Sequence, residues 1–291
     1  MTALDKDRNA WLPIPWTRPD VDLDDPAGLA RLVERDRPDA VIHAAAWTDV
    51  DGCAREPAVA MRRNGAATAA LATACAGREV QLVVISTNEV FDGLRTDGRG
   101  YRPLEEPAPG NPYGASKLAG EVAAAEAYAG IDAPLAIVRT AWLYGPPGHD
   151  FPERILDAAV RAAANGEALR LVADEHGNPT FAPDLAAALV AILAASAAGT
   201  FHVVNEGSAS RAEWARAILE AAGVRLATID VPAATWPRAS TPPPRAILEP
   251  SPVAGAAPLR AWASATAAYV PELLAIRAAR PVAAPPVGSA S

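Results

Sequence analysis

Apolar residues follow two distinct patterns along this chain. Short uninterrupted runs, typical of buried parallel strands, occur at 39–46, 80–86, 135–139, 169–173 and 200–204. Between and after these runs, apolar positions recur with helical spacing at 27–37, 61–76, 113–128, 151–165, 183–197 and 211–222. Strands that alternate with helices in this way predict an α/β fold with a doubly wound parallel sheet, covered by helices on both faces.

The unit that usually opens such a sheet is not visible in the sequence. It consists of a strand, a glycine-rich turn and a helix whose N-terminus binds a pyrophosphate. The first 38 residues contain one glycine, Gly28, and no G-x-G-x-x-G follows any expected strand. Residues 2–5 read either as a strand end that brings Asp5 to a cofactor ribose or as a polar N-terminus. We therefore expect a Rossmann-type sheet with a truncated first unit, which either lies upstream of Met1 or is missing.

Composition narrows the class of protein. The chain has 291 residues, 51% of them hydrophobic, which is enough to bury a sizeable core. Its 26 basic and 34 acidic residues give a net charge of −8, which argues against binding to nucleic acid or an anionic membrane. Two cysteines cannot form a disulfide framework, and the chain shows no signal peptide, so we expect a cytoplasmic protein. The longest apolar run, 185–198, is too short to cross a bilayer.

Tyr113 and Lys117 form the strongest chemical signal. They are four residues apart at the start of an expected helix, so both side chains lie on one helical face. The chain has five tyrosines and only two lysines, so chance seldom produces this spacing. A free phenol has a pKa of about 10, and a neighbouring ammonium should lower that pKa and suit the phenol to proton transfer. The alternative is a stacked pair on an exposed helix.

Two expected strands end in residues that suit a ligand. Ser86 and Thr87 end the 80–86 run, at the carboxyl edge where open α/β sheets bind their ligands. A hydroxyl there can hydrogen-bond a carbonyl oxygen that becomes an alkoxide, although hydroxyls at strand ends also serve as turn formers. The 39–46 run ends in Ala44, Ala45 and Ala46, whose small side chains admit a flat cofactor or tight packing. No histidine stands at metal-ligand spacing with carboxylates or cysteines, so we expect no metal site.

These motifs resemble the extended short-chain dehydrogenase/reductases, and within them the dTDP-4-dehydrorhamnose reductase family. The resemblance covers roughly residues 20 to 270. The matching segments are 37–48 (RPDAVIHAAAWT), Asn64, 85–87 (IST), 90–93 (VFDG), 109–121 (PGNPYGASKLAGE), 139–145 (RTAWLYG), Phe151, 174–180 (DEHGNPT), 184–186 (DLA), 244–248 (PRAIL) and Trp262. It implies NADPH- or NADH-dependent reduction of the C4 keto group of a dTDP-4-keto-6-deoxyhexose.

The resemblance also implies roles for single residues. Tyr113 would protonate the C4 oxygen, Lys117 would bind the nicotinamide ribose, and Thr87 would hydrogen-bond the same carbonyl. The residues expected to line the cofactor are Ala44, Ala45, Ala46 and Thr48, and those expected at the substrate are Thr87, Asn88, Trp142 and Arg245. Trp142 would pack on the sugar or serve as a core aromatic. Arg245 would lie near the diphosphate or on the surface of a proline-rich loop.

The sequence departs from the family pattern after Thr87. The family usually has Asp-Tyr there, whereas this chain has Asn88 and Glu89. An acidic pair at these positions is the mark of the related 4,6-dehydratases, but Asn88 cannot donate a proton as a carboxylic acid does. Two alternatives to the reductase therefore stay open. One is a non-catalytic sugar-nucleotide-binding or regulatory protein that has lost its cofactor, and the other is a nucleotide-sugar 4,6-dehydratase or epimerase.

We expect the following division of the chain. Residues 1–143 and 176–205 form the Rossmann-like nucleotide-cofactor domain, and residues 144–175 and 206–270 form a smaller substrate-binding region. The composition from 271 to 291, rich in alanine and proline, predicts a disordered tail. The expected partner is a nucleotide sugar, with no nucleic acid and no membrane, and a homodimer is a candidate assembly.

Overall fold

A four-stranded parallel sheet forms the centre of the computed structural model, which describes residues 11–18, 20–253 and 257–280. Its strands are β1 (Ala40–His43), β2 (Gln81–Thr87), β3 (Leu135–Thr140) and β8 (Gly199–His202), in the order β1-β2-β3-β8. Every neighbouring pair is parallel, with Val84 opposite His43 on one side and Ile137 on the other. The predicted parallel Rossmann-type sheet is thereby confirmed.

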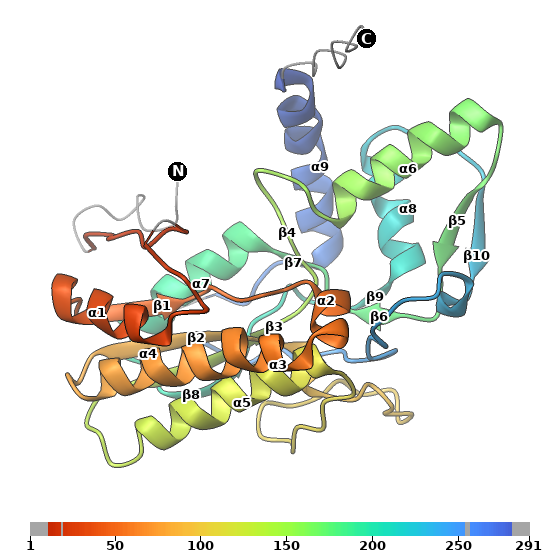
Figure 1. Ribbon diagram of the computed structural model, residues 1–291. Coiled ribbons are helices and arrows are strands. Elements are labelled where there is room, and N and C mark those ends of the chain that lie inside the picture. Colours follow the sequence, from red (N-terminus) through yellow and green to blue (C-terminus); the bar gives the residue numbers. More distant parts are fainter. Residues whose placement is uncertain (1–10, 19, 254–256, 281–291) are drawn as a thin grey trace, which may run out of the picture.

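Helices cover both faces of this sheet (Figure 1). Leu82 and Val84 of β2 pack against α1 (Pro26–Asp36), α4 (Ala67–Ala76) and α5 (Pro112–Ala127). Val83, which points to the opposite face, packs against α7 (Ala182–Ala194). Burial on both faces is why these strands are apolar without alternation, and the doubly wound arrangement predicted from that pattern is confirmed.

A smaller lobe lies at the carboxyl edge of the sheet (Figure 1). It contains α6 (Phe151–Asn165), β5 (Leu169–Val172), α8 (Arg211–Ala221), β10 (Thr228–Val231) and the short helix η4 (Ala233–Thr235). Strand pairs β4 (Leu143–Tyr144) with β7 (Thr180–Phe181), and β6 (His176–Gly177) with β9 (Ala209–Ser210), connect the lobe to the sheet.

The 169–173 run forms a strand, but it does not extend the central sheet. β5 pairs in parallel with β10, in a separate two-stranded sheet. α6 stands between β3 and β5 in the chain, and it buries Leu156, Ala159 and Ala162. Leu169 and Leu171 are buried in a cluster with α6 and α8, not with the strands of the central sheet. Apolar runs alone do not say which core a strand joins.

The prediction of a disordered tail over 271–291 is wrong for residues 271–279, which are helical. α9 runs over Trp262–Ala279 and continues through Pro271. Tyr269, Val270 and Leu273 are fully buried in the same cluster as Tyr144 and Trp214, which stabilises the helix across the proline. The alanine-rich composition here reflects helix propensity. Residues 281–291 lie outside the described residues.

An irregular segment borders β1, which pairs only with β2 among the described residues. Trp11 packs with Ala40 on the α7 side of the sheet, whereas Trp16 packs on the α1 and α4 side. Residues 2–5, including Asp5, lie outside the described residues. Between residues 11 and 39 the structure describes one glycine, Gly28, and it lies inside α1.

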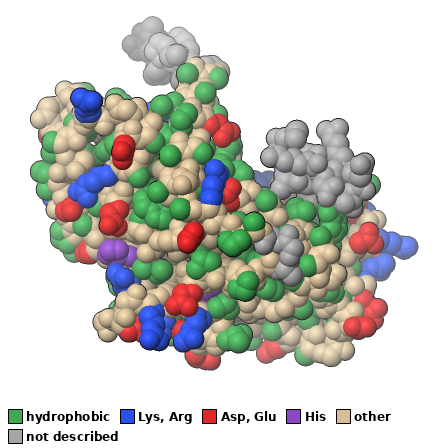
Figure 2. Space-filling view, turned by 180° about the vertical axis from the view of Figure 1, so that it is seen from behind, with side chains coloured by type: hydrophobic (Ala, Val, Ile, Leu, Met, Phe, Trp, Pro, Cys, Tyr) green, Lys and Arg blue, Asp and Glu red, His purple; other side chains and the backbone are tan. Residues whose placement is uncertain are grey.

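Two surface properties complete the description. Among the described residues, no helix combines the length and the apolar character needed to cross a bilayer. On the face shown in Figure 2, the described arginine side chains lie among aspartates and glutamates.

Candidate active site

The carboxyl ends of β1 and β2 meet the first turns of α5. Thr87 is the last residue of β2, and Tyr113 and Lys117 lie on α5. The helix starts where it does because the Asn111 side chain accepts the Gly114 backbone N–H at 2.9 Å and Pro112 occupies the first turn. Tyr113 and Lys117 are both buried, with exposed fractions of 9% and 5%. The alternative interpretation, a stacked pair of Tyr113 and Lys117 on an exposed helix, is therefore wrong.

Tyr113 keeps its proton at neutral pH. Burial raises the pKa of the phenol, the charge of Glu89 raises it further, and a hydrogen bond with the Thr87 side chain opposes both. The expected lowering of this pKa is wrong for the structure, because removal of the phenolate from water raises it. A phenol that stays protonated beside a hydroxyl is suited to donate a proton to an oxygen held between them.

Lys117 is a buried cation. Burial lowers the pKa of its ammonium to about 8, while Glu121, one turn further along α5, acts in the opposite direction. Among the described residues, no carboxylate lies within ion-pair distance of Lys117 and no group hydrogen-bonds it. His43 faces it from β1 but stays neutral, because burial and the Lys117 charge lower the His43 pKa to about 3. A buried ammonium without a partner requires ligand oxygens.

This charge predicts an alkaline limit to activity. Lys117 is charged below its pKa of about 8 and neutral above it, so kcat/KM should fall about tenfold per pH unit beyond that point. A pH–rate profile from pH 6 to 10 measures it. In Lys117→Arg the side chain stays charged, and the limb should move upward by more than a unit. A profile that is flat from pH 7 to 9.5 in the wild type would contradict this role.

The residues beside Lys117 fit the nicotinamide end of a cofactor. Ala44 and Ala45 are exposed and Ala46 is half-buried where β1 ends, and Thr48 is exposed beyond them. Asn64, in the π-helix η2 (Met61–Ala66), fixes this loop: its Oδ1 accepts the Trp47 N–H at 2.7 Å and its Nδ2 donates to the Trp47 carbonyl at 3.0 Å. The small side chains of Ala44, Ala45 and Ala46 leave room for a flat nicotinamide ring, and the Lys117 ammonium suits the hydroxyls of its ribose.

Among the described residues, no glycine-rich turn at a helix N-terminus is present beside β1 to bind the pyrophosphate of the cofactor. The turn that would supply it normally follows a strand next to β1, and no such strand is described on that side. The described residues also hold no cluster of three histidine, cysteine or acidic side chains fit for a metal. Among the described residues, the structure thus assigns none to the pyrophosphate, and the predicted contacts of Ala44, Ala45, Ala46, Thr48 and Lys117 with the cofactor stay predictions.

A cavity of about 670 Å³ separates the sheet edge from the smaller lobe. Its lining from the sheet side includes Thr48 and Glu89, and from the lobe it includes Trp236. The arginines that line it are Arg154, Arg170, Arg211 and Arg238. The sequence analysis missed all four. They come from four separate segments, α6, β5, α8 and the stretch after η4, and no spacing in the sequence connects them to Tyr113.

Asn88 and Glu89, the two residues that depart from the family pattern, have different surroundings. Asn88 is buried, and its Nδ2 donates to the Ala246 carbonyl at 3.0 Å, so it ties the strand end to the 241–248 segment. Glu89 is half-buried and accepts a hydrogen bond of 2.7 Å from Asn111. Burial raises the pKa of the Glu89 carboxyl, against that hydrogen bond and the charge of Arg211.

Trp142 and Arg245 do not line this cavity among the described residues. The indole of Trp142 stacks on Trp214 with ring centroids 5.8 Å apart, and the Arg211 guanidinium lies 3.6 Å from its centroid. Gly177 is required beside it, because a Cβ there would lie 2.5 Å from the indole. Arg245 is half-buried and its backbone pairs with His176. Both substrate contacts stay predictions.

Ser86 is committed to the core. Its hydroxyl donates to Glu121 on α5, and Glu121 also pairs with Arg139 of β3 at 2.6 Å. Arg139 donates in addition to the Pro103 carbonyl at 3.1 Å. This buried network connects β2, α5 and β3 directly behind Thr87 and Tyr113. Thr87 is not part of this network: its hydroxyl accepts the Glu89 backbone N–H at 3.2 Å and lies 3.4 Å from Asn88 Oδ1, so it also caps the turn that follows β2.

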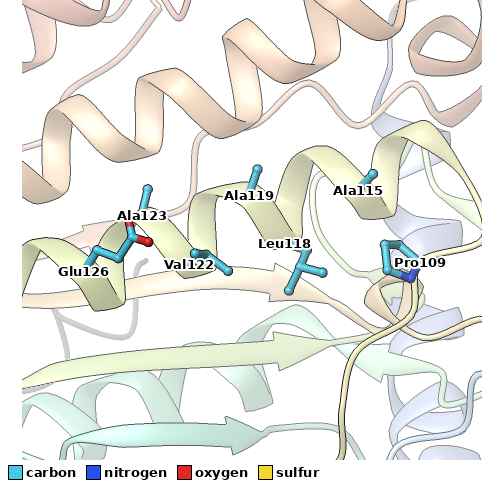
Figure 3. A pocket seen from close by; sticks show the side chains of 7 residues that line it. All are labelled: Pro109, Ala115, Leu118, Ala119, Val122, Ala123 and Glu126. Carbon is cyan, nitrogen blue, oxygen red and sulfur yellow. The ribbon is translucent and has the colours of Figure 1, made fainter.

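A second hollow, of about 400 Å³, lies on the outer side of α5 (Figure 3). Leu118, Val122 and Glu126 point into it from the helix, and Pro109 closes one end. It contains one charged side chain and none of the predicted site residues. Of the predicted site residues, Thr48 lines the larger cavity, which also reaches Glu89, two residues after Thr87.

Comparisons with known proteins agree with this geometry. Residues 2–275 match the family model described as the RmlD substrate binding domain. The chain is 39% identical over 256 residues to dTDP-4-dehydrorhamnose reductase of Mycobacterium tuberculosis, covering 84% of this chain and 80% of that protein. It is 36% identical over 273 residues to the Streptomyces griseus protein of the same name, covering 91% and 86%. The crystal structure of dTDP-4-dehydrorhamnose reductase from Bacillus anthracis in complex with NADP superposes with a TM-score of 0.80 at 29% identity, covering 93% and 95%.

Proposed function

The chain belongs to the RmlD substrate binding domain family, and on that premise we propose that it reduces the C4 keto group of a dTDP-4-keto-6-deoxyhexose with NADPH or NADH. The product would be dTDP-L-rhamnose or a related deoxysugar. The observation that carries the proposal is the convergence of Thr87, Tyr113 and Lys117 at the sheet edge, next to an arginine-lined cavity. A ketone held there has a proton donor on one side and room for its nucleotide on the other.

The chain's own residues act on the carbonyl oxygen. The cofactor supplies a hydride to C4 when it is bound. Tyr113 donates its phenolic proton to the oxygen as negative charge develops there, and the Thr87 hydroxyl hydrogen-bonds the same oxygen. Both groups are fixed before substrate arrives, Thr87 by the end of β2 and Tyr113 by the first turn of α5. Preorganised donors of this kind favour the charge of the transition state.

Lys117 and the β1 edge hold the cofactor. The ammonium of Lys117 would donate to the hydroxyls of the nicotinamide ribose, which satisfies its otherwise unpartnered burial. Ala44, Ala45 and Ala46 would lie under the cofactor, and Thr48 would close its side toward the cavity. After proton donation, the charge of Lys117 would stabilise the Tyr113 phenolate until solvent returns the proton.

The smaller lobe would bind the nucleotide. Trp236 is 44% exposed, and the Arg170 guanidinium lies 5.6 Å from its ring centroid. Arg154 shares the cavity with them, and Arg238 pairs with Asp51 at 3.5 Å. An exposed aromatic ring among guanidinium groups suits a base and a diphosphate. We therefore keep residues 144–175 and 206–270 as the substrate-binding region.

Two further assignments complete the proposal. We propose a cytoplasmic location, since both cysteines are buried free thiols and the nucleotide substrate is intracellular in chemistry. A homodimer also stays a prediction, which light scattering of the purified chain tests. Neither assignment affects the chemistry at Tyr113.

A two-part assay tests the function. Titration with NADPH, followed by nicotinamide fluorescence, should show binding in the micromolar range, and addition of dTDP-4-keto-6-deoxyglucose and its epimers should then oxidise the NADPH. Absence of binding at millimolar NADPH would favour a non-catalytic sugar-nucleotide-binding protein instead. Conversion of dTDP-glucose without added reductant would favour a 4,6-dehydratase.

A further inference from the structure

Arg211 lines the cavity, and its position is fixed by the start of α8. It is the first residue of α8, whose start is fixed by a capping box: Ser210 accepts the Glu213 N–H at 3.0 Å and the Glu213 carboxylate accepts the Ser210 N–H at 2.6 Å. The guanidinium lies 3.6 Å from the Trp142 ring centroid and 5.1 Å from that of Phe151. Stacking on aromatic faces fixes the plane of a guanidinium and leaves its N–H groups at the edge.

Those N–H groups are under-used by the protein. Arg211 approaches one carboxylate, Glu175, at 3.6 Å, which is too long for a hydrogen bond. Among the described residues its guanidinium makes no hydrogen bond, although the side chain is only 23% exposed. Burial lowers the pKa of Arg211 to about 10, so it is charged at neutral pH. A half-buried cation whose N–H groups make no hydrogen bond to the described residues can offer them to a ligand in the cavity.

Glu89 supplies the complementary acceptor in the same cavity. One oxygen, Oε2, accepts from Asn111 at 2.7 Å, and among the described residues Oε1 has no hydrogen-bond partner. Glu89 also lies close enough to Tyr113 for its charge to raise the pKa of the phenol. Its charge acts likewise on Arg211. Arg211 and Glu89 therefore line the same cavity, each with hydrogen-bonding capacity that the described residues leave unused, and Glu89 follows Thr87 by two residues.

We propose that Arg211 and Glu89 determine specificity by selecting a hexose that carries a hydroxyl at C3, next to the C4 keto carbon. A hydroxyl donates one hydrogen bond and accepts another, so it can donate to Glu89 and accept from Arg211 at once. A methylene at C3 does neither and would leave Arg211 with only its 3.6 Å approach to Glu175, and Glu89 with only its hydrogen bond from Asn111. This inference rests on the proposed function, and it adds which keto sugars the cavity accepts.

Discrimination between two substrates tests the inference. The probes are dTDP-4-keto-6-deoxyglucose and its 3-deoxy analogue, compared by kcat/KM. The wild type should prefer the parent by about 10⁴-fold, because sites built to bind a hydroxyl reject analogues that lack it by such factors. Arg211→Met and Glu89→Gln should each slow the parent by about 10²-fold and leave the analogue within a few-fold of wild type.

Control variants separate specificity from structural damage. Arg216→Met changes the same helix at a side chain that pairs with Asp230 outside the cavity, and it should leave the preference unchanged. Equal slowing of both substrates in Arg211→Met and Glu89→Gln would overturn the inference, since damage to the fold does not distinguish them. Equal turnover of both by the wild type would overturn it as well while leaving the reductase intact. Turnover of neither by the wild type would remove the proposed function and this inference together.

Discussion

Replacing Tyr113 with phenylalanine should lower kcat by about 10²- to 10⁴-fold, the usual contribution of a positioned proton donor. The phenol is buried, keeps its proton at neutral pH and shares a hydrogen bond with Thr87, so the variant removes one hydroxyl and little else. Oxidation of NADPH in the presence of the keto sugar measures the loss. KM for both substrates should change little, because the donor acts mainly in the transition state.

Tyr128→Phe is the matched control. Tyr128 caps the other end of α5, and its buried hydroxyl donates to the Val80 carbonyl, far along the helix from Thr87. Its loss should reduce stability by about 1 kcal/mol and leave kcat nearly unchanged. If Tyr113→Phe retained more than a tenth of wild-type kcat, Tyr113 would not be the proton donor.

Replacing Glu121 with alanine should destabilise the fold by about 3–5 kcal/mol, because it strands the buried charge of Arg139. The two side chains are 4% and 5% exposed and their Oε2 and Nη2 atoms lie 2.6 Å apart. Ser86 would lose its acceptor at the same time. Urea unfolding followed by circular dichroism measures the change in free energy.

Glu126→Ala provides the comparison on the same helix. Glu126 is exposed on the outer side of α5, and its removal should change stability by less than about 0.5 kcal/mol. A loss of under 1 kcal/mol in Glu121→Ala would mean that Arg139 finds water or another acceptor. The network would then not be what holds the edges of β2 and β3 beneath the site.

The position of the proposed catalytic residues at the sheet edge was predictable from sequence because its signals are local. Tyr113 and Lys117 are one helical turn apart, and Thr87 ends an apolar run, so period and strand-end rules place all three without knowledge of the lobe. The direction of the Tyr113 pKa shift was not predictable, since it depends on how completely α5 is buried. Burial is a property of tertiary packing that no local pattern encodes.

The substrate side was missed for the opposite reason. Arg211 follows Glu89 by more than a hundred residues and lines the same cavity because α8 packs against α6 and Trp142. A basic residue at a helix start looks the same in sequence whether it faces solvent or a cavity. Likewise, 169–173 reads as a strand, but its pairing with β10 is decided by which apolar surfaces α6 and α8 cover.

Transfer of deuterium tests the central claim most directly. The purified chain is given NADPH deuterated at C4 of the nicotinamide, together with dTDP-4-keto-6-deoxyhexose, and the sugar product is examined by NMR. The proposed reductase places one deuterium on C4 of the sugar, in wild type and not in Tyr113→Phe over the same interval. A reduced sugar whose C4 hydrogen comes from solvent, or no reduced sugar while the cofactor is bound, would contradict it.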